Sequence, residues 1–181
     1  KGAPSFAQCR GARDVGYLLT YGTGLGSPEP TDIANTNCLV LIGTHLGENM
    51  HNTQVQEFAQ AVGRKATIIV VDPRYSVAAS KAKYWLPVKP GTDMALVLAW
   101  MNVLVTEGLY DKEFVAKHGH GFDKFVAAIK DNTPEWAEAM TGIPAATIRR
   151  LAHEMGVTAR DQKIELPIAW TDWWGGEHQT V

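Results

Sequence analysis

Three short stretches combine glycine with charged and hydroxyl side chains in a way that suits nucleotide binding. The first is Gly43-Thr44-His45-Leu46-Gly47-Glu48-Asn49, the second is Asp72-Pro73-Arg74, and the third is Gly91-Thr92-Asp93. Glycine lets a backbone approach a phosphate closely, and a carboxylate at the end of a strand can reach the hydroxyls of a ribose. The first stretch lacks the GxGxxG pattern, so a nicotinamide or flavin fingerprint is not supported.

Two aspartates in these stretches each allow a structural explanation beside the chemical one. Asp72 either contacts a ribose or closes the turn before Pro73. Asp93 either caps the helix that follows it or accepts two N–H bonds from the edge of a guanine. The residues alone leave both pairs of alternatives open.

A cysteine near the start of the chain is a candidate metal ligand or nucleophile. Cys9 opens a helix-like segment and has Arg10 and Arg13 nearby in the sequence. A helix N-terminus and neighbouring cations lower the pKa of a thiol and favour the reactive thiolate. A lone cysteine is more often a small buried apolar residue, which is the simpler interpretation of Cys38. The histidines show no HExxH or other zinc spacing, so a zinc site held by the protein is not expected.

The overall composition is that of an ordinary globular protein. The formal net charge is -2 in 181 residues, and no window approaches the apolar length that a membrane span requires. We therefore expect no nucleic-acid partner and no direct insertion into a membrane. The chain starts at Lys1 without a signal-peptide pattern and ends at Val181 after a Gly-rich loop, so we expect a fragment of a larger, multi-domain chain.

Apolar patterning predicts the elements that must position these stretches. Continuous apolar runs predict buried strands at Leu39 to Ile42 and at Thr67 to Val71, and a shorter run with a proline predicts an edge strand at Tyr84 to Val88. Helices are predicted at Phe6–Thr20, at Asn52–Val62 with Gly63 as its stop, at Asp93–Glu107, at Asp111–His118 with Asp111 as its N-cap, and at Phe122–Ile129. Two more are predicted, one that begins at Pro134 with Thr133 as its N-cap and one at Pro144–Met155. The helix after Asp93 has almost no polar face and should be buried on nearly all sides. A last strand is predicted at Ile164 to Trp170, before the loop Thr171 to Gln179.

The order of strands and helices predicts an α/β fold: a mostly parallel sheet with helices on both faces, a Rossmann-like cofactor-binding domain. Within it we distinguish a helix and loop segment with Cys9 (1–38), a dinucleotide-binding α/β unit (39–108), a helical segment (109–156), and a strand with a Gly-rich loop (157–181).

In this order the motifs resemble the dimethyl sulfoxide reductase superfamily of molybdenum and tungsten enzymes. The most specific pieces are "VVDPR" and "KPGTD" at their separation after the glycine turn, and Trp174-Gly175-Gly176-Glu177-His178 completes the series. Within the superfamily, "GTHLGENMHN" and "GLYDKEFV" are most similar to catalytic subunits of polysulfide or thiosulfate reductase, with respiratory arsenate reductase a near neighbour.

The resemblance implies a bis(molybdopterin guanine dinucleotide) cofactor that holds Mo or W. It places the dinucleotide along Ile42, Gly43, Thr44, His45, Gly47, Glu48 and Asn49, its ribose and phosphates near Val71, Asp72, Pro73 and Arg74, and its guanine at Gly91, Thr92 and Asp93. It implies Cys9 as the metal ligand, Arg10, Arg13 and His178 as residues that orient the substrate, and Trp174, Gly175 and His178 as residues lining the cofactor.

The resemblance also implies partners outside these residues. They are a small anionic or sulfur-containing substrate such as polysulfide, thiosulfate or tetrathionate, an iron–sulfur electron-transfer subunit and, as a further candidate, a membrane-anchor subunit. A [4Fe-4S] cluster is expected in another part of the chain, because its motif is absent from these residues, and the relatives imply a periplasmic location. Two other hypotheses are a cofactor-free structural relative within a respiratory complex and an unrelated nucleotide-binding domain.

Overall fold

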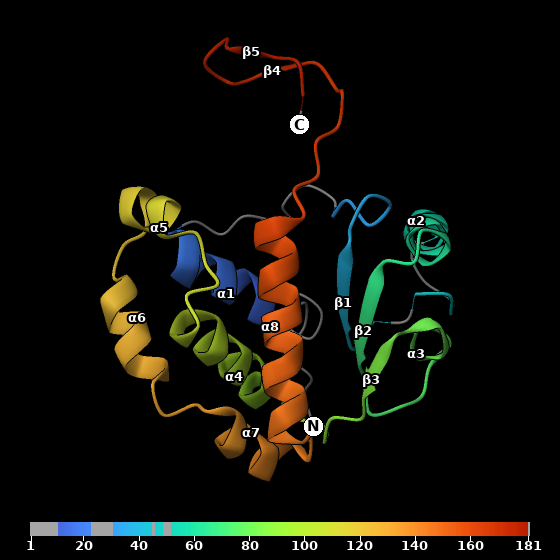
Figure 1. The fold of residues 1–181 in the computed structure, drawn as a ribbon, viewed down its shortest axis with the longest axis vertical. Helices are drawn as coiled ribbons and strands as arrows, with labels where there is room; N and C mark the ends of the chain where they lie inside the picture. The colour runs from blue at the N-terminus through green and yellow to red at the C-terminus, as the bar shows by residue number, and fades with distance from the viewer. Residues whose placement is uncertain (1–10, 23–30, 45, 49–51, 181) are drawn as a thin grey trace. The chain divides into compact units, whose positions relative to one another are not determined.

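The structure is a computed structural model that describes residues 11–22, 31–44, 46–48 and 52–180 (Figure 1). The chain divides into two compact units, Lys1–Asp32 and Ile33–Val181, each of which is described by itself. In the first unit, helix α1 spans Gly11–Tyr21. It confirms the described part of the helix predicted there, and its apolar Val15, Leu18 and Leu19 are exposed.

A parallel sheet organises the second unit. Its strands, among the described residues, are β1 (Cys38–Ile42), β2 (Thr67–Val71) and β3 (Tyr84–Leu86), in the order β1-β2-β3. Ile42 lies opposite Val71, and Val71 lies opposite Leu86. The three strands therefore end at the same edge of the sheet. The strands predicted in all three runs form. β2 is buried as predicted and β3 is an edge strand as predicted, whereas β1 lies at the other edge of the described sheet and only its Leu41 is buried.

Two helices cover one face of this sheet, α2 (Asn52–Gly63) and α3 (Val77–Lys81) (Figure 1). The core on this side contains every second side chain of the strands and the helix residues that cover them. The strand residues are Leu41, Ile68 and Val70, and the helix residues are Phe58, Ala61, Ala78 and Ala79. Helix α3 was not predicted. Its sequence signal is Ser76, whose hydroxyl accepts a hydrogen bond from the Ala79 N–H at 3.2 Å as an N-cap.

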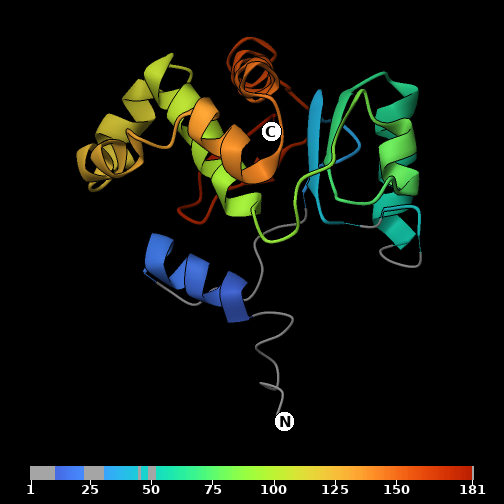
Figure 2. The same cartoon turned by 90° about the horizontal axis from the view of Figure 1, so that it is seen from below.

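The opposite face packs against α4 (Asp93–Thr106), α7 (Pro134–Thr141) and α8 (Ala145–Asp161), as the turned view in Figure 2 also shows. This larger core contains Ile69, Val71, Leu86, Val88, Leu96, Ala99, Trp100, Val103, Ile148 and Leu151. Helices on both faces of a parallel sheet are the predicted α/β fold, which is confirmed. Helix α4 is less enclosed than its sequence predicted, because the Met94 side chain is 69% exposed and Met101 is also exposed within the described structure.

Two short helices follow α4 in the chain, α5 (Lys112–His118) and α6 (Phe122–Ile129), and α6 packs against α4. Asp111 caps α5 by accepting the N–H of Phe114 at 2.8 Å, as predicted. The buried Asn102 of α4 donates to the carbonyl oxygens of Ile129 and Lys130, so its amide holds the end of α6.

The last predicted strand is wrong. In residues 164–169, all of which the structure describes, no strand forms, and Ile164 and Ile168 are exposed. The segment instead leads to a small antiparallel hairpin, β4 (Trp170–Thr171) with β5 (Glu177–His178), separate from the parallel sheet. Pro167 has no N–H to donate to a ladder, and an apolar run alone does not distinguish a strand from an extended connection.

Candidate functional site

The carboxyl edge of the parallel sheet brings the first two candidate stretches together. The N–H of Gly43 donates to the Val71 carbonyl at 2.9 Å, and the N–H of Asp72 donates to the Leu86 carbonyl at 3.2 Å. These bonds extend the sheet ladder by one residue past β1 and β2. Loops at this edge of a parallel sheet are where α/β proteins bind nucleotides.

Glycine is required in the first loop at two positions. Gly43 has φ +59 and Gly47 has φ +94, a backbone region that residues with a Cβ rarely adopt. No atom lies within 4 Å of where a Cβ of Gly43 would be, so the described structure leaves room there. A Cβ on Gly47 would lie 3.1 Å from Cγ1 of Val77, so the first loop approaches the second closely.

Asp72 has a structural role at the end of β2. Its side chain is buried, and its Oδ1 accepts the N–H of Arg74 at 2.8 Å, which closes the turn over Pro73. Its carbonyl oxygen accepts the indole N–H of Trp85 at 2.8 Å. The turn alternative for Asp72 is therefore what the structure shows, and a ribose contact through its other oxygen stays a prediction.

Asp93 differs from Asp72 because its carboxylate has no hydrogen-bond partner among the described residues, although an acidic residue in the first turn of α4 suits the helix dipole. The N-cap of α4 is Thr92, whose hydroxyl donates to the Lys89 carbonyl at 2.7 Å and forms no capping hydrogen bond. Asp93 is the first residue of the helix, half-buried, and its carboxylate forms no hydrogen bond or ion pair with the described residues. The capping explanation for Asp93 is thus wrong, and its carboxylate is available to a ligand.

The loop that precedes Asp93 is held in place by a backbone hydrogen bond to the end of α7. The N–H of Lys89 donates to the Thr141 carbonyl at 3.2 Å, and Thr141 is fully buried at the end of α7. Gly91 has φ +83 with no atom within 4 Å of a Cβ position. The loop therefore has a fixed base and an open glycine next to Asp93.

Glu48 and Arg74 join two stretches that the sequence presented separately. Arg74 Nη2 lies 2.6 Å from Glu48 Oε2, and this hydrogen bond is the main cause that raises the pKa of the arginine. Glu48 Oε1 accepts the N–H of Val77 at 2.7 Å. Sequence reasoning missed this contact, because nothing in the spacing of residues 26 positions apart indicates a bond.

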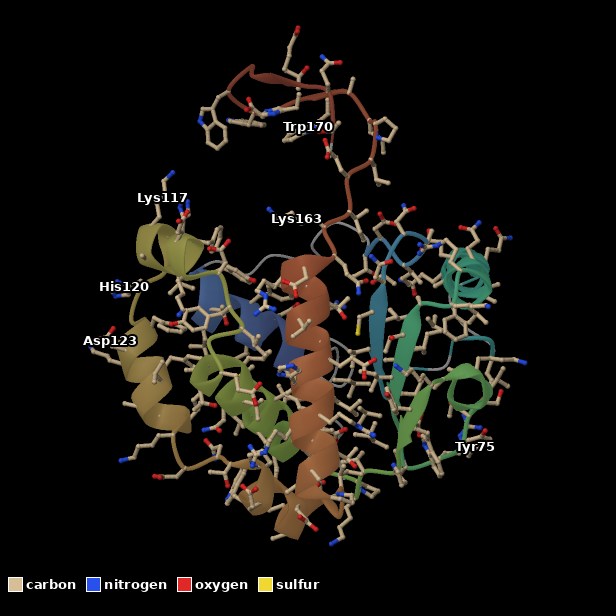
Figure 3. All side chains as sticks on the ribbon, viewed as in Figure 1. Tyr75, Lys117, His120, Asp123, Lys163 and Trp170 are labelled. Carbon is tan, nitrogen blue, oxygen red and sulfur yellow. The ribbon has the colours of Figure 1, made fainter. Side chains whose placement is uncertain are left out.

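Beyond Arg74, the aromatic ring of Tyr75 meets the ring of Trp85 edge to face at 5.0 Å, and Figure 3 shows Tyr75 beside α3.

His178 and its neighbours form a separate small structure in the hairpin. His178 Nε2 lies 3.0 Å from Asp172 Oδ2, and the His178 ring stacks on Trp170 at 4.4 Å, a residue labelled in Figure 3. Asp172 Oδ1 accepts the N–H groups of Trp174 and Gly176, and the histidine is the main cause that lowers the pKa of Asp172. These partners of His178 all belong to the hairpin, so a contact of His178, Trp174 or Gly175 with a cofactor stays a prediction.

Several predicted site residues cannot be placed against this edge. Cys9, Arg10, His45 and Asn49 lie outside the described residues. Arg13 is exposed on α1, in the other compact unit. Within the described part of the chain, no group of three or more His, Cys, Asp or Glu side chains is arranged to hold a metal ion.

Comparison with known proteins identifies the family. The profile described as molybdopterin oxidoreductase matches residues 5–160. The chain belongs to the molybdopterin oxidoreductase family. The sequence resemblance to the dimethyl sulfoxide reductase superfamily, near thiosulfate reductase, is confirmed, and the hairpin lies beyond the matched range.

Individual relatives in this family are much longer than this chain. It is 31% identical to a sulfite dehydrogenase subunit of Allochromatium vinosum, over 99% of this chain and 26% of that protein. It is 38% identical to the thiosulfate reductase molybdopterin-containing subunit PhsA of Salmonella typhimurium, over 80% and 19% respectively. Among solved structures, acetylene hydratase from Pelobacter acetylenicus aligns with a TM-score of 0.70 and 33% identity, over 81% of this chain and 20% of that one. The chain thus spans about a fifth to a quarter of the relatives that it matches.

The residues at the sheet edge fit part of a molybdopterin cofactor, the group that gives this family its name. The edge offers open glycines at Gly43 and Gly91, the guanidinium of Arg74, the hydroxyl of Thr92, and the carboxylate of Asp93, which is unpaired among the described residues. This set of donors and acceptors suits a polar, anionic part of such a cofactor, and no group of metal-ligating side chains lies among the described residues.

Proposed function

We propose that this chain forms the dinucleotide-binding part of a catalytic subunit that carries bis(molybdopterin guanine dinucleotide) with Mo or W and reduces a sulfur-type acceptor. The observation that carries the proposal is Asp93, a carboxylate at the open edge of the sheet that has no hydrogen-bond partner among the described residues. Guanine presents N1–H and N2–H on one edge, and a carboxylate accepts both hydrogen bonds.

The residues of this chain bind and orient; the bound metal group supplies two-electron oxidation and reduction. Asp93 selects guanine, Gly91 lets the loop backbone approach the base, and Thr92 Oγ1 accepts a further hydrogen bond from the nucleotide. Asp72 keeps the turn after β2 in place and offers its second oxygen to a ribose. Arg74, whose charge is paired with Glu48, lies beside the phosphates as a hydrogen-bond donor, while Ile42, Gly43 and Thr44 line their path.

The names of two relatives support a sulfur-containing substrate: a thiosulfate reductase uses one as electron acceptor, and a sulfite dehydrogenase uses one as electron donor. Their substrates are small sulfur oxyanions, which cationic side chains recognise. We extend this class to the present chain, with polysulfide, thiosulfate and tetrathionate as candidate acceptors. Cys9 is the proposed metal ligand, with Arg10, Arg13 and His178 orienting the anion.

The proposal includes partners that deliver electrons. They are an iron–sulfur subunit, a membrane-anchor subunit, and a [4Fe-4S] cluster carried elsewhere in the polypeptide, in a complex that faces the periplasm. Within the part of the chain that the structure describes, no helix has both the length and the apolar character needed to cross a membrane.

Metal and nucleotide analysis of the purified full-length protein tests the proposal. We expect near-stoichiometric Mo or W by mass spectrometry and guanine nucleotide released by acid hydrolysis. A protein that contains neither would be the cofactor-free structural relative instead. Turnover with thiosulfate, tetrathionate and polysulfide, compared with arsenate, then identifies the acceptor, and activity with arsenate alone would contradict the sulfur assignment.

Replacement of Asp93 tests the guanine contact. Asp93→Asn replaces one acceptor oxygen with an amino group that faces a guanine donor, and an unsatisfied buried donor costs about 1–3 kcal/mol. The affinity for the guanine nucleotide should therefore fall about ten- to hundredfold, and the nucleotide content of the purified protein should fall with it. Asp111→Asn is the matched control, because Asn caps α5 as well as Asp does and the residue lies at another helix start. Equal nucleotide content in both variants would exclude the contact.

A further inference from the structure

The carboxylate of Glu48 connects the loop after β1 to the loop after β2 at two points. Its Oε2 accepts a hydrogen bond from Arg74 Nη2 at 2.6 Å, and its Oε1 accepts the backbone N–H of Val77 at 2.7 Å. One oxygen thus holds the side chain of Arg74 in the loop after β2, and the other holds the backbone of Val77 at the start of α3. Two bonds to different groups fix the orientation of the second loop more tightly than one ion pair would.

The backbone beside Glu48 adds a third connection. Gly47 has φ +94, and a Cβ at this position would lie 3.1 Å from Cγ1 of Val77. The first loop therefore lies directly against the residue whose N–H Glu48 accepts. Charge, hydrogen bonding and close packing all join the same two loops.

An acidic side chain at this place needs an explanation, because the proposed ligand is itself anionic. A carboxylate near a pyrophosphate repels it unless the charge is paired. The pair with Arg74 neutralises Glu48, and the bond to Val77 turns the second oxygen toward the protein backbone. Both oxygens of Glu48 are thereby used within the protein.

We propose that Glu48 is a positioning residue, which acts through Arg74 and the Val77 N–H to hold the two nucleotide-binding loops in one arrangement. This role replaces the direct cofactor contact that the sequence predicted for Glu48, and it rests on the proposed function. With the two loops joined, Arg74 and the turn at Asp72 stay in place relative to Gly43. Without the joint, each loop moves separately and the dinucleotide dissociates faster.

The bond to the backbone is tested by replacing Val77 in the cofactor-loaded full-length protein. Val77 is the first residue of α3, where a proline is tolerated, and Ser76 before it has an extended backbone with ψ 173, which suits a residue that precedes a proline. Val77→Pro removes the N–H that Glu48 accepts and leaves the helix intact. Val77→Ala keeps that N–H and removes only side-chain packing. We expect the whole dinucleotide cofactor to dissociate about tenfold faster from Val77→Pro, and within about twofold of the wild-type rate from Val77→Ala.

The connection through Arg74 is tested by combining substitutions. Glu48→Gln should speed cofactor release about tenfold. The double variant Glu48→Gln with Arg74→Ala should release no faster than the more affected single variant, because both act through one contact. Fully additive effects would mean that the two residues contact the ligand independently and would overturn the proposal.

Thermal unfolding separates positioning from a general role in stability. The Arg74 side chain is 55% exposed and that of Glu48 is 23% exposed, and such pairs add little to global stability. We expect the melting temperatures of the variants, measured on the cofactor-free protein, to stay close to that of cofactor-free wild type, while release rates from the loaded protein change. Melting temperatures that fall in step with faster release would overturn the positioning role. A wild-type protein without guanine nucleotide would overturn the proposed function, whereas a loaded protein whose variants release like wild type would overturn only this inference.

Discussion

Asp72 and Asp93 show how the same residue type acquires different roles after a strand and at the start of a helix. The Asp72 carboxylate accepts a hydrogen bond two residues along the chain, which is the usual behaviour of an aspartate before a turn. Asp93 cannot act as a cap, because Thr92 holds that position and the helix has already begun. The sequence indicated that both residues were candidates. The sequence could not distinguish a capping Asp93 from one that is not a cap, because the two cases differ by only one residue in where α4 starts.

Cys38 is a residue whose chemistry depends on two charged neighbours. Burial raises the pKa of its thiol, the Glu154 carboxylate raises it further, and the Lys83 ammonium group opposes this. We expect iodoacetamide to label Cys38 more slowly in the folded protein than in urea at about pH 8.5, the ordinary thiol pKa, because a raised pKa leaves less thiolate. Peptide mass mapping measures the labelling of this one residue.

The two neighbours of Cys38 should change its labelling in opposite directions. Lys83 Nζ and Glu154 Oε1 form an ion pair at 2.6 Å, so each substitution removes one side of the same contact. Glu154→Gln should speed labelling by lowering the pKa of the thiol, and Lys83→Met should slow it by raising that pKa. Faster labelling in both variants would indicate that local loosening, and not charge, controls access to Cys38.

At the scale of elements, the end of α2 explains one wrong prediction. Gly63 was expected to stop this helix, yet it is the last helical residue, and the left-handed conformation falls on Lys65 at φ +62. The N–H of Ala66 donates to the Ala61 carbonyl and that of Lys65 to the Val62 carbonyl, which is a Schellman ending. Glycine is common at such a position but not required, so its place in the sequence put the expected end too early.

Two helical glycines should respond oppositely to alanine. A Cβ on Gly63 would meet no atom within 4 Å, whereas one on Gly156 would lie 2.7 Å from Leu104 Cδ2 and 2.8 Å from Leu109 Cβ. Gly63→Ala should therefore raise the free energy of unfolding by about 0.5 kcal/mol through helix propensity. Gly156→Ala should lower it by about 1–3 kcal/mol, because α8 can no longer pack closely on α4. Urea unfolding measures both, and effects of the same sign would contradict the close packing of α8.

Elements with strong local signals were predictable, and those that depend on distant contacts were not. Thr133 and Asp111 cap their helices as expected, since a hydroxyl or carboxylate before a helix needs only its own neighbours. The run from Ile164 was predicted as a strand because it is apolar. Whether such a run joins a sheet depends on a partner strand, and the described residues provide none there.

At the scale of the whole molecule, the parallel sheet explains why the site was visible in the sequence. Parallel strands joined by crossovers end at one edge, so motifs after successive strands must lie near each other. The βαβ pattern thus predicted where Gly43 and Asp72 would meet. It did not predict the contact from Glu48 to Arg74 and Val77, because pairing between loops depends on side-chain directions that periodicity does not contain.

A shared ligand edge also predicts that nucleotide binding stabilises the whole fold. A ligand that binds only the native state adds about 2.7 kcal/mol to the free energy of unfolding at a hundredfold excess over its Kd. GDP should therefore raise the melting temperature of the cofactor-free protein. ADP should not, because adenine presents an acceptor nitrogen beside its amino group, and that nitrogen would face the carboxylate of Asp93. The GDP effect should be lost in Asp93→Asn and kept in Asp111→Asn, whose residue caps α5. Equal shifts with GDP and ADP would contradict guanine selection by Asp93 and leave the phosphate-facing loops as the source of binding.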